Sequence, residues 1–152
     1  MGLGAVSSNS YGYFGGGSVD PDLVNTVDRI DFSNETTSAP GNNLSQSKYL
    51  LAATSSNSYG YFGGGFFSPP TQTLDTIERL DFSNETLSLP GNELTPAKKS
   101  SATASNNSYG YFAGGFPQPL GVLDRIDFSN ETVSAPGTEL TQAREKLAAV
   151  SN

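Results

Sequence analysis

The stretch that decides the fold is Asn57-Ser58-Tyr59-Gly60-Tyr61-Phe62-Gly63-Gly64-Gly65, which the chain contains three times. The first copy runs from Asn9 to Gly17, and the third runs from Asn107 to Gly115 with Ala113 in place of one glycine. Two further blocks recur in the same order after each copy, at 27–36, 77–86 and 123–132, and then at 40–44, 90–94 and 136–140. A period of about 50 residues is typical of propellers and other repeat arrays.

The apolar runs within each repeat have the pattern of strands. They are short, rich in β-branched and aromatic residues, and bounded by Gly, Asn and Pro, whereas an amphipathic helix needs apolar residues at 3.6-residue spacing over a longer stretch. In the middle repeat we expect four strands, near 51–54, 59–62, 76–82 and 86–89. Strands this short cannot bury a core alone, so each repeat must stack on a neighbour. The predicted fold class is therefore all-β.

The 152 residues are expected to form a single repeat domain. The repeats span approximately 3–50, 51–100 and 101–146, and 147–152 copies the small-residue segment that opens the chain. We expect the C-terminal copy to complete a sheet across a junction with another chain, and the N-terminal copy to be frayed or displaced. Repeats this similar indicate recent duplication, engineering, or a fragment of a longer array.

With these blocks the chain resembles the kelch-repeat β-propeller family, as a divergent member, over nearly its whole length. Four features of the family recur in each repeat. The Gly pair is Gly15-Gly16, Gly63-Gly64 and Gly114-Gly115, and the third-strand Asp is Asp31, Asp81 and Asp127. The turn Thr is Thr36, Thr86 and Thr132, and the basic residue before the inner strand is Lys48, Lys98 and Arg144. The chain departs from the family at the usual Tyr (Ile30, Leu80, Ile126) and the usual Trp (Thr37, Leu87, Val133). The resemblance implies that each repeat is a four-stranded blade of a propeller.

Three blades are fewer than the four to eight that propellers typically contain. An open arc of three would leave two sheet faces uncovered, and such surfaces favour association with another chain. A head-to-tail contact closes into a ring when the rotation per chain divides the circle. We therefore predict a homodimer whose two chains close a six-bladed ring.

Composition argues against several function classes. The formal net charge of −7 disfavours nucleic acid as a partner, and no apolar run is long enough to cross a membrane as a helix. The start, Met1-Gly2-Leu3-Gly4, is unlike a signal peptide, and the compartment is left open. The chain has no His and no Cys, so we expect no metal site, no cofactor and no enzymatic activity.

A charged set recurs on the third strand and in the turn after it. Its members are Arg29, Asp31 and Glu35, then Arg79, Asp81 and Glu85, then Arg125, Asp127 and Glu131. The set could form a polar ligand site, but we favour ion pairs within or between blades that fix the register, with the three Glu as partners of the three Arg.

Three other motifs have both a functional and a structural interpretation. The Asn-Glu-Thr triplets at 34–36, 84–86 and 130–132 match the N-glycosylation pattern but are better explained as β-turns. The Gly clusters lack the following helix and Lys of a phosphate loop, so we interpret them as strand ends with special backbone angles. The repeated Tyr and Phe residues could stack on sugars or bases, and we favour packing between blades.

The loops after the Gly clusters, at 18–26, 66–76 and 116–122, vary in length while the rest of the repeat does not. Loops on rigid scaffolds often carry binding. A candidate contact patch consists of Phe66, Phe67, Pro69, Phe116 and Pro117. The loops could equally reflect tolerance to insertion. The sequence thus favours a non-catalytic self-assembling scaffold, with a protein- or glycan-binding module that uses these loops as the alternative.

Overall fold

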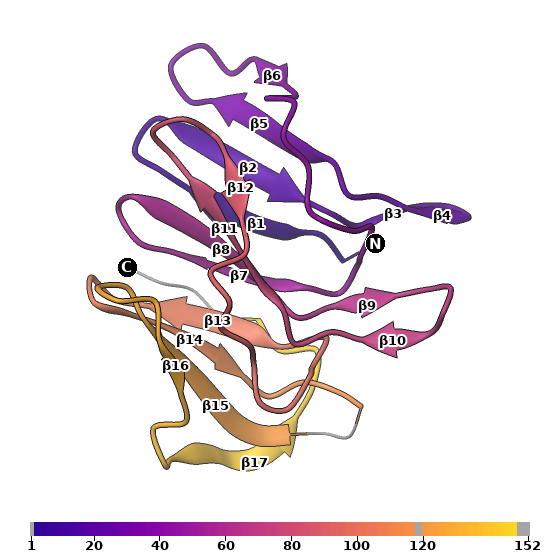
Figure 1. Ribbon diagram of the computed structural model, residues 1–152, viewed down its shortest axis with the longest axis vertical. Helices are drawn as coiled ribbons and strands as arrows, with labels where there is room; N and C mark the ends of the chain where they lie inside the picture. Colours follow the sequence, from indigo (N-terminus) through magenta and orange to yellow (C-terminus); the bar gives the residue numbers. More distant parts are fainter. Residues whose placement is uncertain (1, 118–119, 149–152) are drawn as a thin grey trace.

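The computed structural model describes residues 2–117 and 120–148, and all regular elements in this part of the chain are β-strands in antiparallel sheets. Each repeat forms one sheet with four strands side by side, and the sheet of the third repeat has a fifth strand (Figure 1). The first sheet has the order β1 (Gly4–Ser7), β2 (Tyr11–Gly15), β5 (Val27–Asp31), β6 (Thr37–Ser38). The second has β7 (Ala52–Ser55), β8 (Tyr59–Gly63), β11 (Ile77–Asp81), β12 (Leu87–Ser88), and the third has β13 (Ala102–Ser105), β14 (Tyr109–Ala113), β15 (Leu120–Asp127), β16 (Val133–Ser134). The predicted all-β class is confirmed, and the sheet of the middle repeat has one strand near each of the four predicted ranges.

Short polar side chains fix the turns of each sheet. Between β1 and β2 the hydroxyl of Ser8 accepts a hydrogen bond from the Tyr11 N–H at 3.1 Å. Between β5 and β6 the Asn34 amide oxygen accepts from the Thr36 N–H at 3.0 Å and from the Thr36 hydroxyl at 2.6 Å. Such side-chain-to-backbone bonds are the reason that Asn, Ser and Thr favour turns. The Asn-Glu-Thr triplets are therefore turn motifs in all three repeats.

The three sheets are stacked in a row, with β1, β7 and β13 neighbouring one another (Figure 1). Backbone hydrogen bonds join the starts of successive repeats, from Leu50 N–H to Gly2, from Ser100 N–H to Leu50, and from Lys146 N–H to Ser100. The sheets approach closely here, because a Cβ atom added at Gly60 would lie 2.5 Å from a methyl carbon of Val6. Glycine at the second position of β8 is thus a condition of the stacking.

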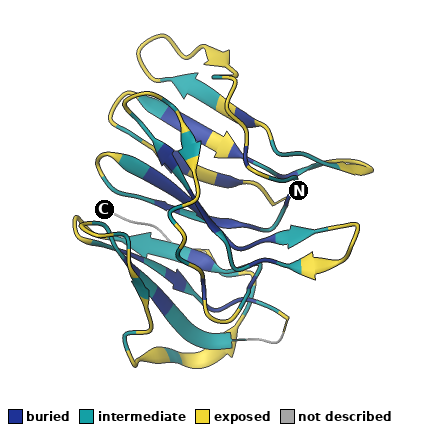
Figure 2. Ribbon diagram, viewed as in Figure 1, coloured by how far each residue is buried: buried dark blue, intermediate teal, exposed yellow. Residues whose placement is uncertain are grey.

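Two apolar cores fill the spaces between the sheets, and Figure 2 shows the buried residues along the central strands. Phe62, Leu80 and Tyr13 are fully buried between the first and second sheets. Phe112, Ile126 and Tyr61 are fully buried between the second and third. Of the repeated Tyr and Phe residues, Tyr13, Tyr61, Phe62 and Phe112 therefore pack between repeats.

The variable loops contain strands that the sequence pattern does not predict. The first two form small hairpins, β3 (Ser18–Val19) with β4 (Asp22–Leu23) and β9 (Phe66–Phe67) with β10 (Gln72–Thr73). In the third repeat β15 begins earlier, at Leu120, and pairs with β17 (Glu139–Arg144). In the second repeat, the linker to the next repeat lies where β17 lies in the third repeat. There the linker makes a single β-bridge, between Thr76 and Glu93.

The two copies of the inner strand differ in what the structure describes. In the single chain β1 pairs with β2 over four residues, from Gly4 opposite Gly15 to Ser7 opposite Gly12. Most of the C-terminal copy, 149–152, lies outside the described residues. Among the residues that are described, no helix has the length and apolar character needed to cross a membrane.

Candidate functional site: the contacts between repeats and the two outer faces

A buried ion pair joins each repeat to the next. Lys48, at the end of the first repeat, lies with its Nζ 2.8 Å from Oε1 of Glu78 on β11, and both side chains are almost fully buried. Ser45 N–H donates to the other carboxylate oxygen at 2.6 Å. Lys98 Nζ likewise lies 2.6 Å from Oδ2 of Asp124 on β15. Each linker thus supplies the cation, and the third strand of the following repeat supplies the anion.

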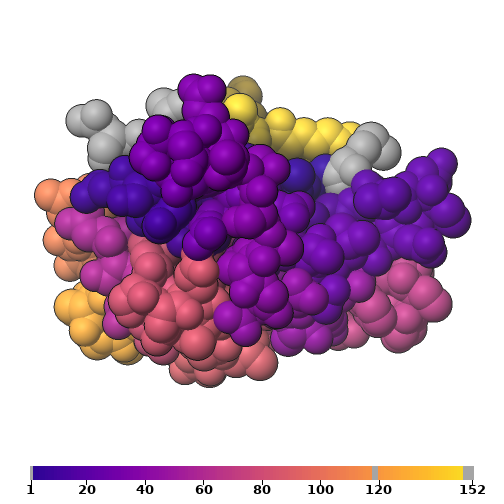
Figure 3. Space-filling view, turned by 90° about the horizontal axis from the view of Figure 1, so that it is seen from above, coloured from indigo at the N-terminus to yellow at the C-terminus, as the bar shows by residue number. Residues whose placement is uncertain are grey.

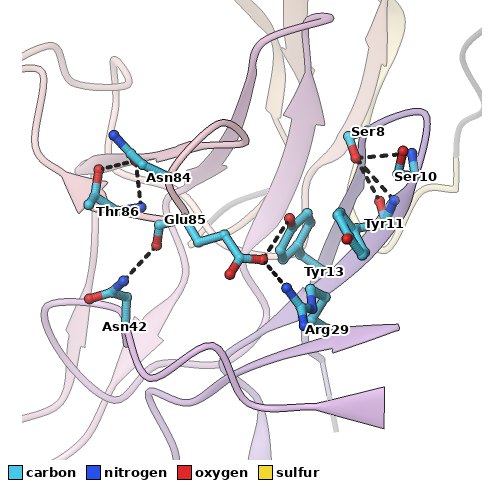
Figure 4. A network of polar contacts seen from close by, with 9 residues as sticks. All are labelled: Ser8, Ser10, Tyr11, Tyr13, Arg29, Asn42, Asn84, Glu85 and Thr86. Carbon is cyan, nitrogen blue, oxygen red and sulfur yellow. Dashed lines mark hydrogen bonds and ion pairs between the residues drawn. The ribbon is translucent and has the colours of Figure 1, made fainter. Parts of the chain in front are cut away.

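A second contact runs through the glutamate of the turn between the third and fourth strands. Glu85 Oε1 accepts hydrogen bonds from the Tyr13 hydroxyl at 3.0 Å and from Arg29 Nη1 at 2.8 Å (Figure 4). Asn42 Nδ2 donates to the backbone oxygen of Glu85 at 2.8 Å, also across the interface. Glu131 accepts from Tyr61 and Arg79 in the same way. Arg29 and Arg79 are therefore paired with the Glu of the next repeat.

The backbone of these glutamates is strained. Glu85 and Glu131 have φ angles of 59° and 60°, in the left-handed region that non-glycine residues rarely adopt. Residues held in such regions cost roughly 1–3 kcal/mol each and persist where the surroundings impose the conformation. Here the Asx turn imposes it, and the result is that each carboxylate points at the preceding repeat.

Burial raises the pKa of the Tyr13 hydroxyl well above its ordinary value, and the hydrogen bond to Glu85 raises it further. Tyr61 has a raised pKa for the same reasons, first burial and then the charge of Glu131. Because the ordinary pKa of Tyr is already about 10, both phenols are protonated donors at neutral pH.

Aromatic rings complete the interface. The ring of Phe82 stacks on that of Tyr13 at 5.5 Å and 11°, and Phe128 stacks on Tyr61 at 5.4 Å and 10°. Phe62 packs on Gly15, where an added Cβ would lie 3.0 Å from the ring, and Phe112 packs on Gly63 in the same manner at 2.6 Å. The last residue of the second strand must be Gly for the ring of the next repeat to seat fully.

The first repeat has no preceding repeat, so the residues that would contact one lie on the surface at this end of the row. We call the outer side of the first sheet, with Phe14, Asp28, Ile30, Phe32 and Glu35, the leading face. Phe14 is 39% exposed and Phe32 is 50% exposed, whereas Phe62 and Phe112, the equivalents of Phe14, are fully buried. Asp28 and Glu35 are exposed as well. Figure 3 looks onto the end of the molecule where the first repeat, in indigo and purple, lies.

At the opposite end, the residues of the third repeat that would contact a following repeat lie on the surface. We call the outer side of the third repeat, with Tyr111, Leu123, Arg125, Leu140 and Arg144, the trailing face. Four of them, Tyr111, Leu123, Leu140 and Arg144, are more exposed than their equivalents in the earlier repeats, which are buried. Arg125 is half-buried, like Arg29 and Arg79. Arg125 lies 4.7 Å over the Tyr109 ring, as its equivalents lie over Tyr11 and Tyr59. Within the described chain Arg125 donates to the Ser134 hydroxyl rather than to a carboxylate.

The predicted polar network forms two separate kinds of contact in the structure, one between repeats and one within each turn. Its Arg and Glu members meet across repeats, which leaves Arg125 and Glu35 at opposite ends. Asp31, Asp81 and Asp127 stay within their own turns, where the N–H and hydroxyl of Ser33, Ser83 and Ser129 donate to them. These bonds lower the pKa of each Asp carboxyl below its ordinary value. Sequence reasoning missed the pairs of Lys48 with Glu78 and Lys98 with Asp124, although a cation and an acid recur at these positions in every repeat.

One lysine contacts two aromatic residues of the candidate loop patch. Lys99 Nζ lies 3.7 Å from the centre of the Phe66 ring and 4.9 Å from that of Phe116, and Tyr49 meets Phe66 edge-on at 5.5 Å. Phe67 is half-buried on β9, while Pro69 and Pro117 are exposed. Phe66 and Phe116 thus already contact a cation from their own chain.

No protein-family model matches the chain, and no curated protein matches it either.

Proposed function

We propose that the protein is a non-catalytic structural scaffold, a β-propeller that forms when chains of three kelch-like blades associate head to tail. The proposal rests on the leading face and the trailing face, whose equivalents contact each other inside the chain. Internal junctions bring together two kinds of surface, and the two ends of the chain each hold one of them. A heterologous contact of this kind links the leading face of one copy to the trailing face of another.

Burial of the exposed apolar side chains supplies a driving force. Moving a Phe side chain from water into a packed interface is worth about 1.5–3 kcal/mol, and Phe14 and Phe32 lie on the same face. Contiguous apolar surface rimmed by charges is typical of association sites. In a pair of chains both faces of each chain are covered, because the ring is closed.

Two chains give six blades, within the range of four to eight that propellers use, while three chains give nine. A homodimer is therefore the assembly that we propose. A binding module that uses the loops has less support, because the rings of Phe66 and Phe116 are engaged by Lys99.

The mass in solution tests the proposal. Sedimentation equilibrium over a range of concentrations should give twice the chain mass of 15.9 kDa. A monomer at every concentration would contradict self-association. Larger species that grow with concentration would contradict the closed pair, since they are expected of a head-to-tail contact that does not close.

A further inference from the structure

The two faces can be matched residue by residue, and this deepening rests on the proposed function. We propose that the occupant of the leading face is the trailing face of a second copy of this chain, held by an ion pair between Arg144 of one copy and Asp28 of the other. In the same junction Glu35 accepts hydrogen bonds from Tyr111 and Arg125 of the other copy.

Arg144 occupies the backbone position of the buried lysines. The carbonyl oxygens of Lys48, Lys98 and Arg144 accept hydrogen bonds from equivalent glycines, at 2.8, 2.9 and 2.9 Å. The side chain of Arg144 therefore starts where the side chains of Lys48 and Lys98 start, and it is the one cation of the three that is exposed in the described chain.

Asp28 occupies the position of the buried acids. Glu78 lies opposite Phe62 in its sheet, Asp124 lies opposite Phe112, and Asp28 lies opposite Phe14. Within the described residues Asp28 makes no ion pair, in contrast to its two equivalents. The junction pairs an Arg with an Asp, and the longer guanidinium with its planar fork can bind the shorter carboxylate at two points.

Glu35 on the leading face already has the backbone conformation that Glu85 and Glu131 have in the internal junctions. Glu35 has a φ of 58°, the same strained value as its two paired equivalents, and the same Asx turn holds it. Among the described residues no group donates to its carboxylate, so the strained turn presents an acceptor that has no partner within the chain. Tyr111 and Arg125 are the donors that correspond to Tyr13 and Arg29, and they lie on the trailing face.

One position differs from the internal junctions. The trailing face has Ala113 where the other repeats have Gly15 and Gly63, and an added Cβ at those two glycines would lie 3.0 and 2.6 Å from the incoming Phe ring. Phe14 of the second copy therefore cannot seat as deeply as Phe62 and Phe112 do. The trailing face also has Thr138 where Asn42 and Asn92 donate to the backbone of the next repeat. The junction between copies is thus weaker than the junctions within a chain, which keeps assembly dependent on concentration.

Charge reversal tests the ion pair on the full-length chain. Asp28→Arg and Arg144→Asp should each raise the dissociation constant of the assembly at least about thirtyfold, because removing one partner of a buried charge pair leaves the other unpaired. An equimolar mixture of the two variants should restore association, since each junction of the mixed pair again joins opposite charges. Asp22→Arg, on the exposed hairpin, is the matched control and should change the dissociation constant less than about threefold.

The outcomes separate the two proposals. Circular dichroism first establishes that each variant is folded, which we expect because both side chains are exposed in the single chain. If the natural chain is monomeric, the proposed function and this junction both fail. If the natural chain associates while both reversals leave the dissociation constant unchanged, or the mixture fails to restore association, the residue assignment is wrong and the scaffold proposal stands.

Ala113→Gly gives an independent test with the opposite sign. Removal of the methyl group lets Phe14 seat as its two equivalents do. The closed pair contains this contact twice, so deeper burial worth about 0.7 kcal/mol at each junction lowers the dissociation constant by about tenfold. An unchanged or higher dissociation constant would mean that the junction does not bring Phe14 against this strand.

Discussion

Replacement of Lys48 by methionine should lower the free energy of unfolding by about 3–5 kcal/mol, because it strands a buried carboxylate. Glu78 is 2% exposed, and Lys48 Nζ is the cation that balances it. The Ser45 N–H would remain as a hydrogen-bond donor to Glu78, but a single amide does not replace a full charge. Urea unfolding followed by tyrosine fluorescence, at one fixed protein concentration, measures the loss.

A double variant identifies the cause of this loss. In Lys48→Met with Glu78→Gln the buried charge is gone, while the amide oxygen still accepts from Ser45, so most of the stability should return. Lys146→Met, at a lysine whose side chain is 79% exposed, should change the free energy by less than about 0.5 kcal/mol. If the double variant is as unstable as the single one, the stranded carboxylate is not the reason for the loss.

Truncation of Phe62 to alanine should also cost about 3–5 kcal/mol, through the lost apolar burial and the cavity that remains. The ring is fully buried among residues of two different repeats, and it rests on Gly15, which cannot move to fill the space without breaking β2 pairing. The same urea titration measures the effect. A cost below about 1 kcal/mol would show that the sheets can collapse onto one another, contrary to the close backbone approach at Gly60.

Leu89→Ala is the control for this truncation. Leu89 is 57% exposed after β12, so the loss of its side chain should change stability by less than about 0.5 kcal/mol. A similar loss in both variants would indicate a general effect of removing apolar surface rather than the interface between repeats.

Much of the fold follows from local pattern, because strand periodicity and turn residues act over a few positions. The strand β8 and the turn at Asn84 could both be predicted, since Gly63 to Gly65 and the Asx turn end the pairing by local geometry. Period-2 alternation places Tyr13 and Phe14 on opposite sides of β2, and in the structure Tyr13 is buried while Phe14 is exposed.

The contacts between repeats could be predicted only in part. Alternation gives the face on which Arg29 lies, but the choice between Glu35 in its own repeat and Glu85 in the next depends on how the sheets stack. A lysine is almost never fully buried unless it is paired, so nothing local marked Lys48 as an interior residue. The strand β17 consists largely of polar residues and pairs with β15 because the linker passes beside that strand, which is a property of the assembled chain.

The offset of the buried ion pairs has a consequence for how such a gene can change length. Each lysine belongs to one period and its acid to the following one, and Lys48 and Lys98 occupy equivalent places. Excision of exactly one period would therefore bring Lys48 to Asp124 and leave every interior charge compensated. An excision that removes one member of a pair would strand a buried charge, at a cost of about 3–5 kcal/mol, whereas a change confined to a variable loop would not. Recombination that removes whole units therefore keeps every buried lysine matched with an acid.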